Sequence, residues 1–464
     1  MYDMQFDDWI AQKEEDILND ITRIVAIPSV AKKSKNPEYP CGTDCARVLD
    51  FALGLAESFG LDTKNYDYYC GSAILPGKTD RKIGVFVHLD TAAVSDVWLS
   101  DPFSAYIHDG YIIGCGVQDN KGAAISLLYL LKLLKENQVQ LVHTIELVFG
   151  CAKKIGMIDI DRYLTSTDAP QLSFVADADF PVCTQEKGCA DFKLTCPFED
   201  DFIEDFHAGY DTNAIPDTAF ALIKGANYKD VLEKTKNVPN CSVIPAGPFI
   251  KISVRTKGGH AAFPFDRTSP IPILAKLLMD IGLVNQARPV LNFLYNVYSS
   301  CDGLPFDLYD YLKPSEATTH ICSTTSVSKN RFSHTISIRY ANIHKSAEVI
   351  QKVKKVAKSN GFDCRLVSNT DPWTPDPFPL SMSSFLTNMA NKYSGTKLSP
   401  YSMGGTTYAH KLPNAIPFGP NRIRESFPIM YGIGHIANEA IFIEDLMTLI
   451  KVYAATIIEI DKMF

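Results

Sequence analysis

The chain has 464 residues, so two domains are expected rather than a single hydrophobic core. Its hydrophobic fraction of 46% and charged fraction of 21% are those of an ordinary globular protein. The net charge of −8 argues against nucleic acid or an anionic membrane as a partner, because both bind basic surfaces.

The N-terminal stretch MYDMQFDDWIAQKEEDIL is acidic and amphipathic, whereas a signal peptide has a basic region followed by an apolar core. No apolar run approaches the roughly 18 residues of a membrane span. The 12 cysteines include no C-x-x-C pair, and we expect most of them to be reduced, partly buried thiols. Together these features predict a cytoplasmic protein.

The first part of the chain alternates between helical and strand-like segments. Isoleucines recur at near-helical spacing over residues 10–24, and Pro28 opposes continuation of that helix. KIGVFVHLD, HTIELVFG and QLSFVADAD are typical of buried strands, and GAAISLLYLLKLLKEN is typical of an apolar helix. Strands that alternate with helices predict an α/β domain with a mainly parallel sheet.

The pattern changes after about Cys189. DFKLTCPF, FIKISVRTKG and RFSHTISIRYA alternate with polar residues, as expected of a sheet with one exposed face. SAEVIQKVKKVAKSNGF predicts a helix that ends near Gly361. Apolar α/β character returns after TDPWTPDPFP, so we predict an α+β domain at 189–378, inserted between two parts of the first domain at 1–188 and 379–464.

Side chains able to bind a metal gather at the predicted strand ends of the first domain. His88 and Asp90 lie two apart, Asp119 precedes the apolar helix, Asp177 closes a strand, and His435 lies in a glycine-flanked loop. Open α/β sheets place their sites in this region. Singly, each residue has a structural interpretation, such as a helix cap for Asp119, a turn for Asp177 and a core or surface role for either histidine.

Seven segments occur in the order seen in one family of di-zinc peptidases. They are VHLDTAAVSDVWLSDPF, GCGVQDNKGAAI, VADADFPVCTQEKG, DTNAIPDTA, GGHAAFP, GGTTYAHKLPNAIPFG and GHIANEAI. The chain resembles this family, which includes aminoacylase, acetylornithine deacetylase, succinyl-diaminopimelate desuccinylase and the PepV-type dipeptidases. Its length and the ADADFP…EKG block are most similar to the PepV type. The resemblance implies a zinc-exopeptidase-like catalytic domain interrupted by a lid domain.

The resemblance also implies roles for the gathered residues. His88 and Asp177 would hold one zinc, His435 would hold the other, and Asp119 would bridge both. Asp90 would orient His88 as an outer carboxylate.

Four further residues match substrate-binding positions of the family. Asn213, His260 and Arg339 match lid positions that bind substrate or the developing oxyanion, and Gly405 matches part of a glycine-rich substrate loop. The implied ligand is a dipeptide or an N-acyl amino acid.

The segment GCAKKIG departs from this pattern. Similar proteins carry two consecutive glutamates there, of which the first is the general base and the second is a zinc ligand. This chain has Lys153 and Lys154 instead, after Ala152 in place of an aspartate. Further departures from the family pattern occur at Cys115, Asn120, Thr406 and His410.

Replacing two carboxylates by two ammonium groups changes the pocket by about four charge units, and each like-charge contact at about 4 Å costs on the order of 4 kcal/mol. Loss of a general base alone removes about 10²–10⁴ in rate. We therefore expect that Lys153 and Lys154 form ion pairs with Asp119 and Asp177, leaving a metal-poor and catalytically impaired relative that binds a peptide-like ligand.

Two alternatives remain open from the sequence. The lysines could point to solvent. Otherwise, His88, Asp119 and Asp177 could hold one zinc in an active dipeptidase or N-acyl amino acid amidohydrolase, with a neutral Lys153 as base.

Overall fold

The structure is a computed structural model that describes residues 2–94, 98–262, 264–265, 267–314, 316–421, 431–432, 434–435 and 437–463. The chain forms two compact units. Unit 1 comprises Met1–Gln185, Thr374–Tyr401 and Thr406–Phe464, and unit 2 comprises Glu186–Trp373 and Ser402–Gly405.

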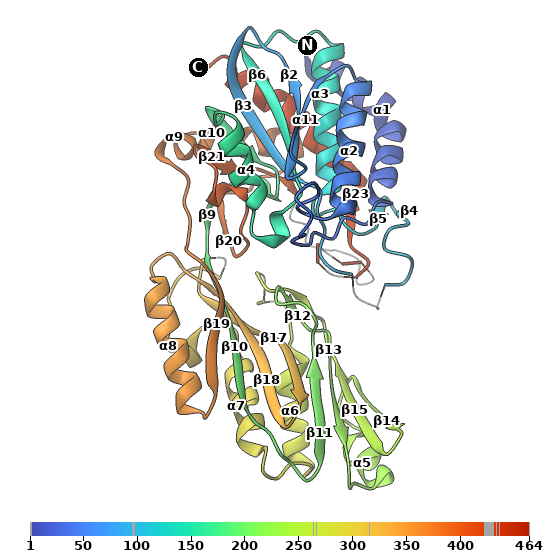
Figure 1. Cartoon of the computed structure of the whole chain (residues 1–464), viewed down its shortest axis with the longest axis vertical. Coiled ribbons are helices and arrows are strands. Elements are labelled where there is room, and N and C mark those ends of the chain that lie inside the picture. The colour runs from blue at the N-terminus through green and yellow to red at the C-terminus, as the bar shows by residue number, and fades with distance from the viewer. Residues whose placement is uncertain are drawn as a thin grey trace. The chain divides into compact units, whose positions relative to one another are not determined.

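Unit 1 is built on a six-stranded sheet with the order β1-β2-β6-β3-β7-β21 (Figure 1). The pairs β6/β3, β3/β7 and β7/β21 are parallel, whereas β1/β2 and β2/β6 are antiparallel. The strands are β1 (Asp62–Tyr66), β2 (Cys70–Leu75), β3 (Thr79–His88), β6 (His143–Gly150), β7 (Leu172–Val175) and β21 (Ala415–Pro417).

The helices of unit 1 supply much of its core. They are α1 (Tyr2–Val25), α2 (Thr43–Ser58), α3 (Lys121–Glu136), α4 (Ile158–Ser166), α9 (Pro377–Ser381), α10 (Ser383–Ser394) and α11 (Ile443–Ile460). Helix α3 packs on β3 and β6, and α1 and α11 pack on α3. Because it is covered on several sides, α3 can be apolar around almost its whole circumference.

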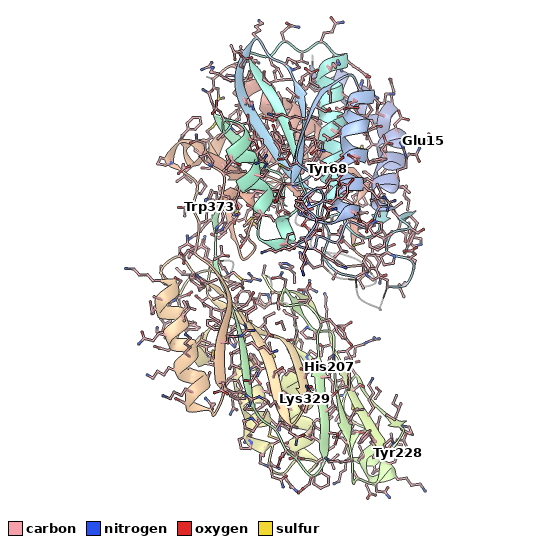
Figure 2. The ribbon with its side chains drawn as sticks, in the orientation of Figure 1. Glu15, Tyr68, His207, Tyr228, Lys329 and Trp373 are labelled. Carbon is pink, nitrogen blue, oxygen red and sulfur yellow. The ribbon has the colours of Figure 1, made fainter. Side chains whose placement is uncertain are left out.

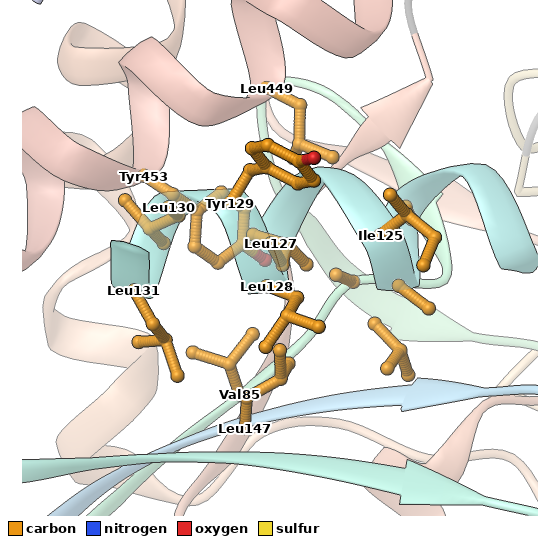
Figure 3. Packing of buried hydrophobic residues seen from close by; sticks show 14 of the residues in the cluster. Val85, Ile125, Leu127, Leu128, Tyr129, Leu130, Leu131, Leu147, Leu449 and Tyr453 are labelled. Atoms are coloured by element: carbon orange, nitrogen blue, oxygen red, sulfur yellow. The ribbon is translucent and has the colours of Figure 1, made fainter. Parts of the chain in front are cut away.

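The contact between α3 and the sheet positions the carboxyl ends of the central strands. Figure 3 shows Leu128 and Leu131 on the side of α3 that faces Val85 of β3 and Leu147 of β6. All eight residues of β6 are buried, as expected for a strand with neighbours on both edges and helices above its face.

Short elements complete unit 1 and the chain segments at its boundary. They are β4 (Tyr106–His108), β5 (Tyr111–Ile113), β8 (Ala178–Asp179), β9 (Cys183–Glu186), β20 (Tyr401–Met403), β22 (Pro420–Asn421), β23 (Ala440–Phe442) and the 3-10 helices η1 (Lys153–Ile155) and η3 (Tyr408–His410).

Unit 2 contains an antiparallel eight-stranded sheet with the order β14-β15-β13-β11-β17-β18-β10-β19. The strands are β10 (Gly188–Pro197), β11 (Ile203–Ala208), β13 (Thr218–Ile223), β14 (Cys241–Ala246), β15 (Phe249–Arg255), β17 (Thr319–Ser328), β18 (Arg331–Tyr340) and β19 (Asp363–Thr370). A separate pair joins β12 (Ala214–Ile215) to β16 (Gly259–His260).

Four α-helices pack on this sheet. They are α5 (Tyr228–Thr235), α6 (Pro270–Asp280), α7 (Arg288–Tyr298) and α8 (Ser346–Ser359), with a 3-10 helix η2 at Leu304–Phe306. Helix α6 packs on β13 and β15, α7 on β17, and α8 on β19 and β10. The hydroxyl of Tyr228, labelled in Figure 2, donates a hydrogen bond to the carbonyl of Val243 and thereby joins α5 to β14.

The expected alternation between exposed and buried residues is present in β13 and β15. It is wrong for β18, which is buried on both faces from His334 to Tyr340. This strand lies between β17 and β10. Cross-strand hydrogen bonds to β17 pair two of its small polar side chains: the Thr324 hydroxyl donates to that of Thr335 at 2.9 Å, and the hydroxyls of Ser326 and Ser333 lie 3.2 Å apart.

All twelve cysteines are free thiols, and most are buried. Among the described residues, no helix combines the length and the apolar character that crossing a bilayer requires.

A buried histidine makes the stability of unit 2 depend on pH. His334 is 1% exposed, lies among the rings of Phe293, Phe332 and Phe362, and makes no hydrogen bond through either ring nitrogen with a described residue. Burial lowers its pKa to about 3. The unfolded chain takes up this proton near pH 6.5, so stability is full above that pH and declines as the pH falls toward 3.

We therefore predict that His334→Phe flattens the pH dependence of unfolding between pH 6.5 and 4.5, removing a slope of up to about 1.4 kcal/mol per pH unit. Urea unfolding of the parent and the variant at several pH values measures this slope. As a control, the half-exposed His108 replaced by glutamine should leave the profile unchanged. Parallel profiles for the parent and His334→Phe would contradict the prediction.

Candidate functional site

Three neighbouring strands of unit 1 end at the same edge of the sheet. His88 is the last residue of β3, Asp177 follows β7, and Lys153 and Lys154 lie in η1 after β6. Because β6, β3 and β7 are parallel neighbours, their carboxyl ends converge there. Asp119 joins this group from the turn before α3.

His88 is fully buried and lies between two carboxylates. Its Nε2 is 2.8 Å from Oδ1 of Asp119 and 3.6 Å from Oδ1 of Asp177. One potential ligand atom from each of these three residues lies within 4.8 Å of the others. The Nδ1 of His88 is 2.8 Å from the backbone oxygen of Asp90 and 3.4 Å from its carboxylate.

Both lysine side chains point into this group. The Nζ of Lys153 is 2.8 Å from Oδ2 of Asp177, and the Nζ of Lys154 is 2.5 Å from Oδ2 of Asp119. The Nζ of Lys154 is also 2.9 Å from Nε2 of His435, which itself lies 3.0 Å from Asp119. The two lysine side chains are only 15% and 12% exposed, so the interpretation that they point to solvent is wrong.

The ion pairs dominate the electrostatics of the site. Burial alone would raise the pKa of Asp177, but Lys153 and His88 lower it to about 2. Burial also opposes ionisation of Asp119, yet the two lysines and His88 hold its pKa well below the usual range.

The cations respond in the opposite sense. Burial would lower the pKa of Lys153, but Asp177 and Asp119 raise it above its ordinary value. The same two carboxylates overcome burial at His88 and raise its pKa to about 10. At neutral pH Asp119 and Asp177 are therefore ionised, and Lys153 and His88 are protonated. The ammonium nitrogen of Lys153 has no lone pair for a metal.

Buried carboxylates hold the turn that carries the lysines. Asp90 accepts the backbone N–H groups of Lys153 at 3.2 Å and Lys154 at 2.7 Å. Asp159 accepts the N–H of Ala152 at 2.7 Å and the hydroxyl of Tyr408 at 2.5 Å. The Asp90 carboxylate thus orients the lysine turn as well as lying near His88.

A third buried carboxylate holds the turn that carries Asp119. Glu439 accepts the backbone N–H groups of Gly116, Gln118 and Asp119 at 3.0, 2.8 and 2.9 Å. The sequence analysis missed Asp159, Tyr408 and Glu439. Glu439 does stand in the segment GHIANEAI, but no sequence pattern identifies an acceptor for the N–H groups of a distant turn.

Asp119 is not a helix cap. The residue before the first turn of α3 is Asn120, whose side chain makes no capping hydrogen bond. Instead, its Oδ1 accepts the N–H of His88 at 3.2 Å, and its Nδ2 donates to the carbonyl of Ala176 at 2.8 Å. Asn120 therefore joins the ends of β3 and β7 beside the site.

Unit 2 brings three of its predicted site residues together. The Nη2 of Arg339 donates to Oδ1 of Asn213 at 2.7 Å, and Arg339 is only 5% exposed. The pairing of β12 with β16 places Ala214 opposite His260, and the N–H of Ala261 donates to the carbonyl of Asn213 at 2.7 Å.

The glycine-rich segment that includes Gly405 also contributes to unit 2. A Cβ added to Gly404 would meet backbone atoms of Ala262 at 3.0 Å, so a side chain there would disturb the turn after His260. At Gly405 an added Cβ would meet the end of the flexible Met403 side chain at 2.8 Å.

The donor set can be compared with what metal ions need. Two adjacent metal ions do not fit, because the second position would have Asp119, His435 and the ammonium of Lys154, which repels a cation. His88, Asp119 and Asp177 form a three-ligand set suited to one zinc, although Lys153 already neutralises Asp177.

The sequence is similar to named dipeptidases over nearly its full length. It is 27% identical to "Putative dipeptidase YtjP" of Bacillus subtilis (98% of this chain, 99% of the relative). It is also 27% identical to "Putative dipeptidase SH1171" of Staphylococcus haemolyticus (97% of each).

The fold is similar to that of solved dipeptidases. Human carnosine dipeptidase 1 aligns with a TM-score of 0.59 at 15% identity, covering 99% of each chain. The dipeptidase Dug1p of Saccharomyces cerevisiae aligns with a TM-score of 0.59 at 12% identity, covering 98% of this chain and 97% of its own. At these identities the likeness concerns the fold.

The α/β unit with its strand-end group and the antiparallel second unit thus agree with the family resemblance of the sequence. The sequence model of Peptidase family M20/M25/M40 matches residues 84–459, and the chain belongs to this metallopeptidase family.

Proposed function

We propose that this chain is a metallo-dipeptidase-like protein in which ion pairs take the place of the metal centre, so that it is metal-poor, catalytically impaired and binds a peptide-like ligand. The observation that carries the proposal is the Nζ of Lys154, which lies 2.5 Å from Asp119 and 2.9 Å from His435. The Lys154 ammonium neutralises the carboxylate of Asp119, as a bound metal ion would.

The lysines also lack the chemistry of the residues they replace. A general base must accept a proton, and Lys153 is held as an ammonium by Asp177 and Asp119, which raise its pKa. Lys154 cannot serve as an anionic ligand. Were a zinc bound, it would supply a Lewis acid and an activated water, but the residues around it provide no carboxylate base at this turn.

The ligand-binding part of the proposal is supported by unit 2 and by the relatives. Arg339 offers a buried guanidinium, whose planar donors suit a carboxylate, and Asn213 holds it in place. The relatives named above are dipeptidases by name. We therefore propose a dipeptide or an N-acyl amino acid as the ligand class.

A second candidate is an active dipeptidase or N-acyl amino acid amidohydrolase with one zinc. The three-ligand set of His88, Asp119 and Asp177 favours it, since three protein ligands with one open position are typical of catalytic zinc. This candidate requires that Lys153 lose its proton and that its ion pair with Asp177 break. Both changes are opposed by the attraction to the carboxylates that raises the pKa of Lys153.

Metal content and hydrolysis separate these candidates. We expect the native chain to hold well below one zinc per chain and to leave a dipeptide panel intact. The double variant Lys153→Glu/Lys154→Glu restores two carboxylates and should bind about two zinc ions, because the ammonium repulsion is gone. Elemental analysis and a hydrolysis assay with and without chelator measure both quantities.

The variant Lys153→Arg/Lys154→Arg is the matched control, because it keeps the positive charge and should stay metal-poor. Two tightly bound zinc ions in the native chain would refute the ion-paired site. One zinc with chelator-sensitive hydrolysis in the native chain would establish the second candidate instead.

Stability provides a test that does not depend on activity. Asp177→Asn should lower the free energy of unfolding of the native chain in chelator by about 3–5 kcal/mol, since it leaves the buried Lys153 ammonium unpaired. Adding Lys153→Met should recover most of this loss. If the site were instead a metal site that had lost its ion, Asp177→Asn would relieve repulsion between carboxylates and raise the stability. The sign of the change in the free energy of unfolding therefore distinguishes an ion-paired site from an empty metal site.

Binding by unit 2 gives a further prediction. In chelator, the native chain should bind an intact dipeptide, and Arg339→Met should weaken that binding by about tenfold or more through loss of the charged hydrogen bonds. Isothermal titration measures the affinity, with Lys276→Met as a control on a surface ion pair. Equal affinity for the native chain and Arg339→Met would exclude Arg339 from the ligand site.

A further inference from the structure

Unit 2 contains a cavity of about 550 Å³, lined by residues of α6, α7 and β17. Figure 1 labels these three elements. The elements around it belong to this unit, so it does not depend on how the units are placed. Its size is that of a small-molecule site. The apolar and aromatic part of the wall comprises Ile273, Leu277, Tyr295, Tyr298 and Ile321.

The charges on the cavity wall do not cancel. Lys276 and Asp280 neutralise each other at 2.8 Å. The backbone N–H of Arg267 donates to the carbonyl of Pro264 at 3.1 Å. Its side chain is half-buried and makes no hydrogen bond or ion pair with any residue that the structure describes. His320, the histidine in the wall, adds no second positive charge at neutral pH, because burial lowers its pKa. One guanidinium is therefore left for an anion.

The backbone beside Arg267 leaves room for its side chain. A Cβ added to Gly259 would meet the Nε, Cδ and Cγ atoms of Arg267 at 2.8, 2.9 and 3.0 Å. Gly259 thus lets the arginine side chain lie flat against β16. Any larger residue at position 259 would displace Arg267 without removing its charge.

We propose that this cavity binds a small monocarboxylate with an apolar body about the size of a phenyl ring and a short chain. The carboxylate pairs with the Arg267 guanidinium, whose planar donors suit two oxygens. The apolar body lies against α6 and α7, where its removal from water favours binding. A single unbalanced charge within apolar walls favours a monoanion over a phosphate. The residues that line it include neither Arg339 nor any member of the lysine-containing group.

Titration calorimetry of the full chain in chelator tests the proposal. The probes are 3-phenylpropionate, its neutral amide 3-phenylpropionamide, and inorganic phosphate. We expect the carboxylate to bind at least about tenfold more tightly than the amide or phosphate. Arg267→Met and Gly259→Ala should each weaken carboxylate binding, the first by about tenfold or more.

Matched variants keep the test specific. Lys224→Met should change the affinity by less than about twofold, because the side chain of that lysine is exposed, pairs with Glu204 and does not line the cavity. The double variant Lys153→Glu/Lys154→Glu should not change the affinity for 3-phenylpropionate. The test of this cavity therefore remains valid even if the proposed function is wrong.

Three outcomes would overturn the proposal. The first is no binding of 3-phenylpropionate up to about 10 mM, and the second is equal affinity for carboxylate and amide. The third is binding that Arg339→Met abolishes while Arg267→Met and Gly259→Ala leave it intact, which would assign the ligand to the Asn213–Arg339 group.

Discussion

The central constraint in unit 1 is that Asp119 and Asp177 are carboxylates almost removed from water and must be neutralised where they stand. Metal ions usually do this in a metallopeptidase. Here two ammonium groups reach the same oxygens, at 2.8 Å from Lys153 and 2.5 Å from Lys154. These ion pairs neutralise both carboxylates at the sheet edge without a metal ion, which is the basis of the proposed function.

Buried carboxylates fix the turns that carry the charged residues of the site. Asp90 and Asp159 accept backbone N–H groups from the turn that carries the lysines, and Glu439 does the same for the turn that carries Asp119. A buried carboxylate that accepts several backbone N–H groups fixes the conformation of a loop that lacks the regular backbone hydrogen bonds of a helix or sheet. Lys153 and Lys154 therefore stand on a turn that two buried carboxylates hold in place.

Unit 2 carries recognition chemistry of its own. The Asn213–Arg339 pair and the Arg267 cavity both present a guanidinium in a partly apolar setting, and both lie within a single unit. The loss of hydrolysis that we propose for the sheet edge of unit 1 would not remove either feature. A protein of this kind can retain ligand binding after its reaction is lost, since binding and bond cleavage depend on different residues.

The sequence by itself determined the family, the α/β character with a second α+β region, and the residues that would stand at the strand ends. Hydrophobic periodicity and local motifs are properties of neighbouring residues, so they can be read along the chain. The sequence also identified the conflict at Lys153 and Lys154, because residue type alone fixes the sign of a charge.

Only the tertiary structure decided where those charges go. That Lys154 reaches Asp119 and His435, that Asn120 rather than Asp119 begins α3, and that Glu439 holds a turn more than three hundred residues away are contacts between distant segments. The burial of both faces of β18 depends likewise on its neighbours in the sheet. No local pattern encodes such pairings, because they arise from how strands and turns pack together.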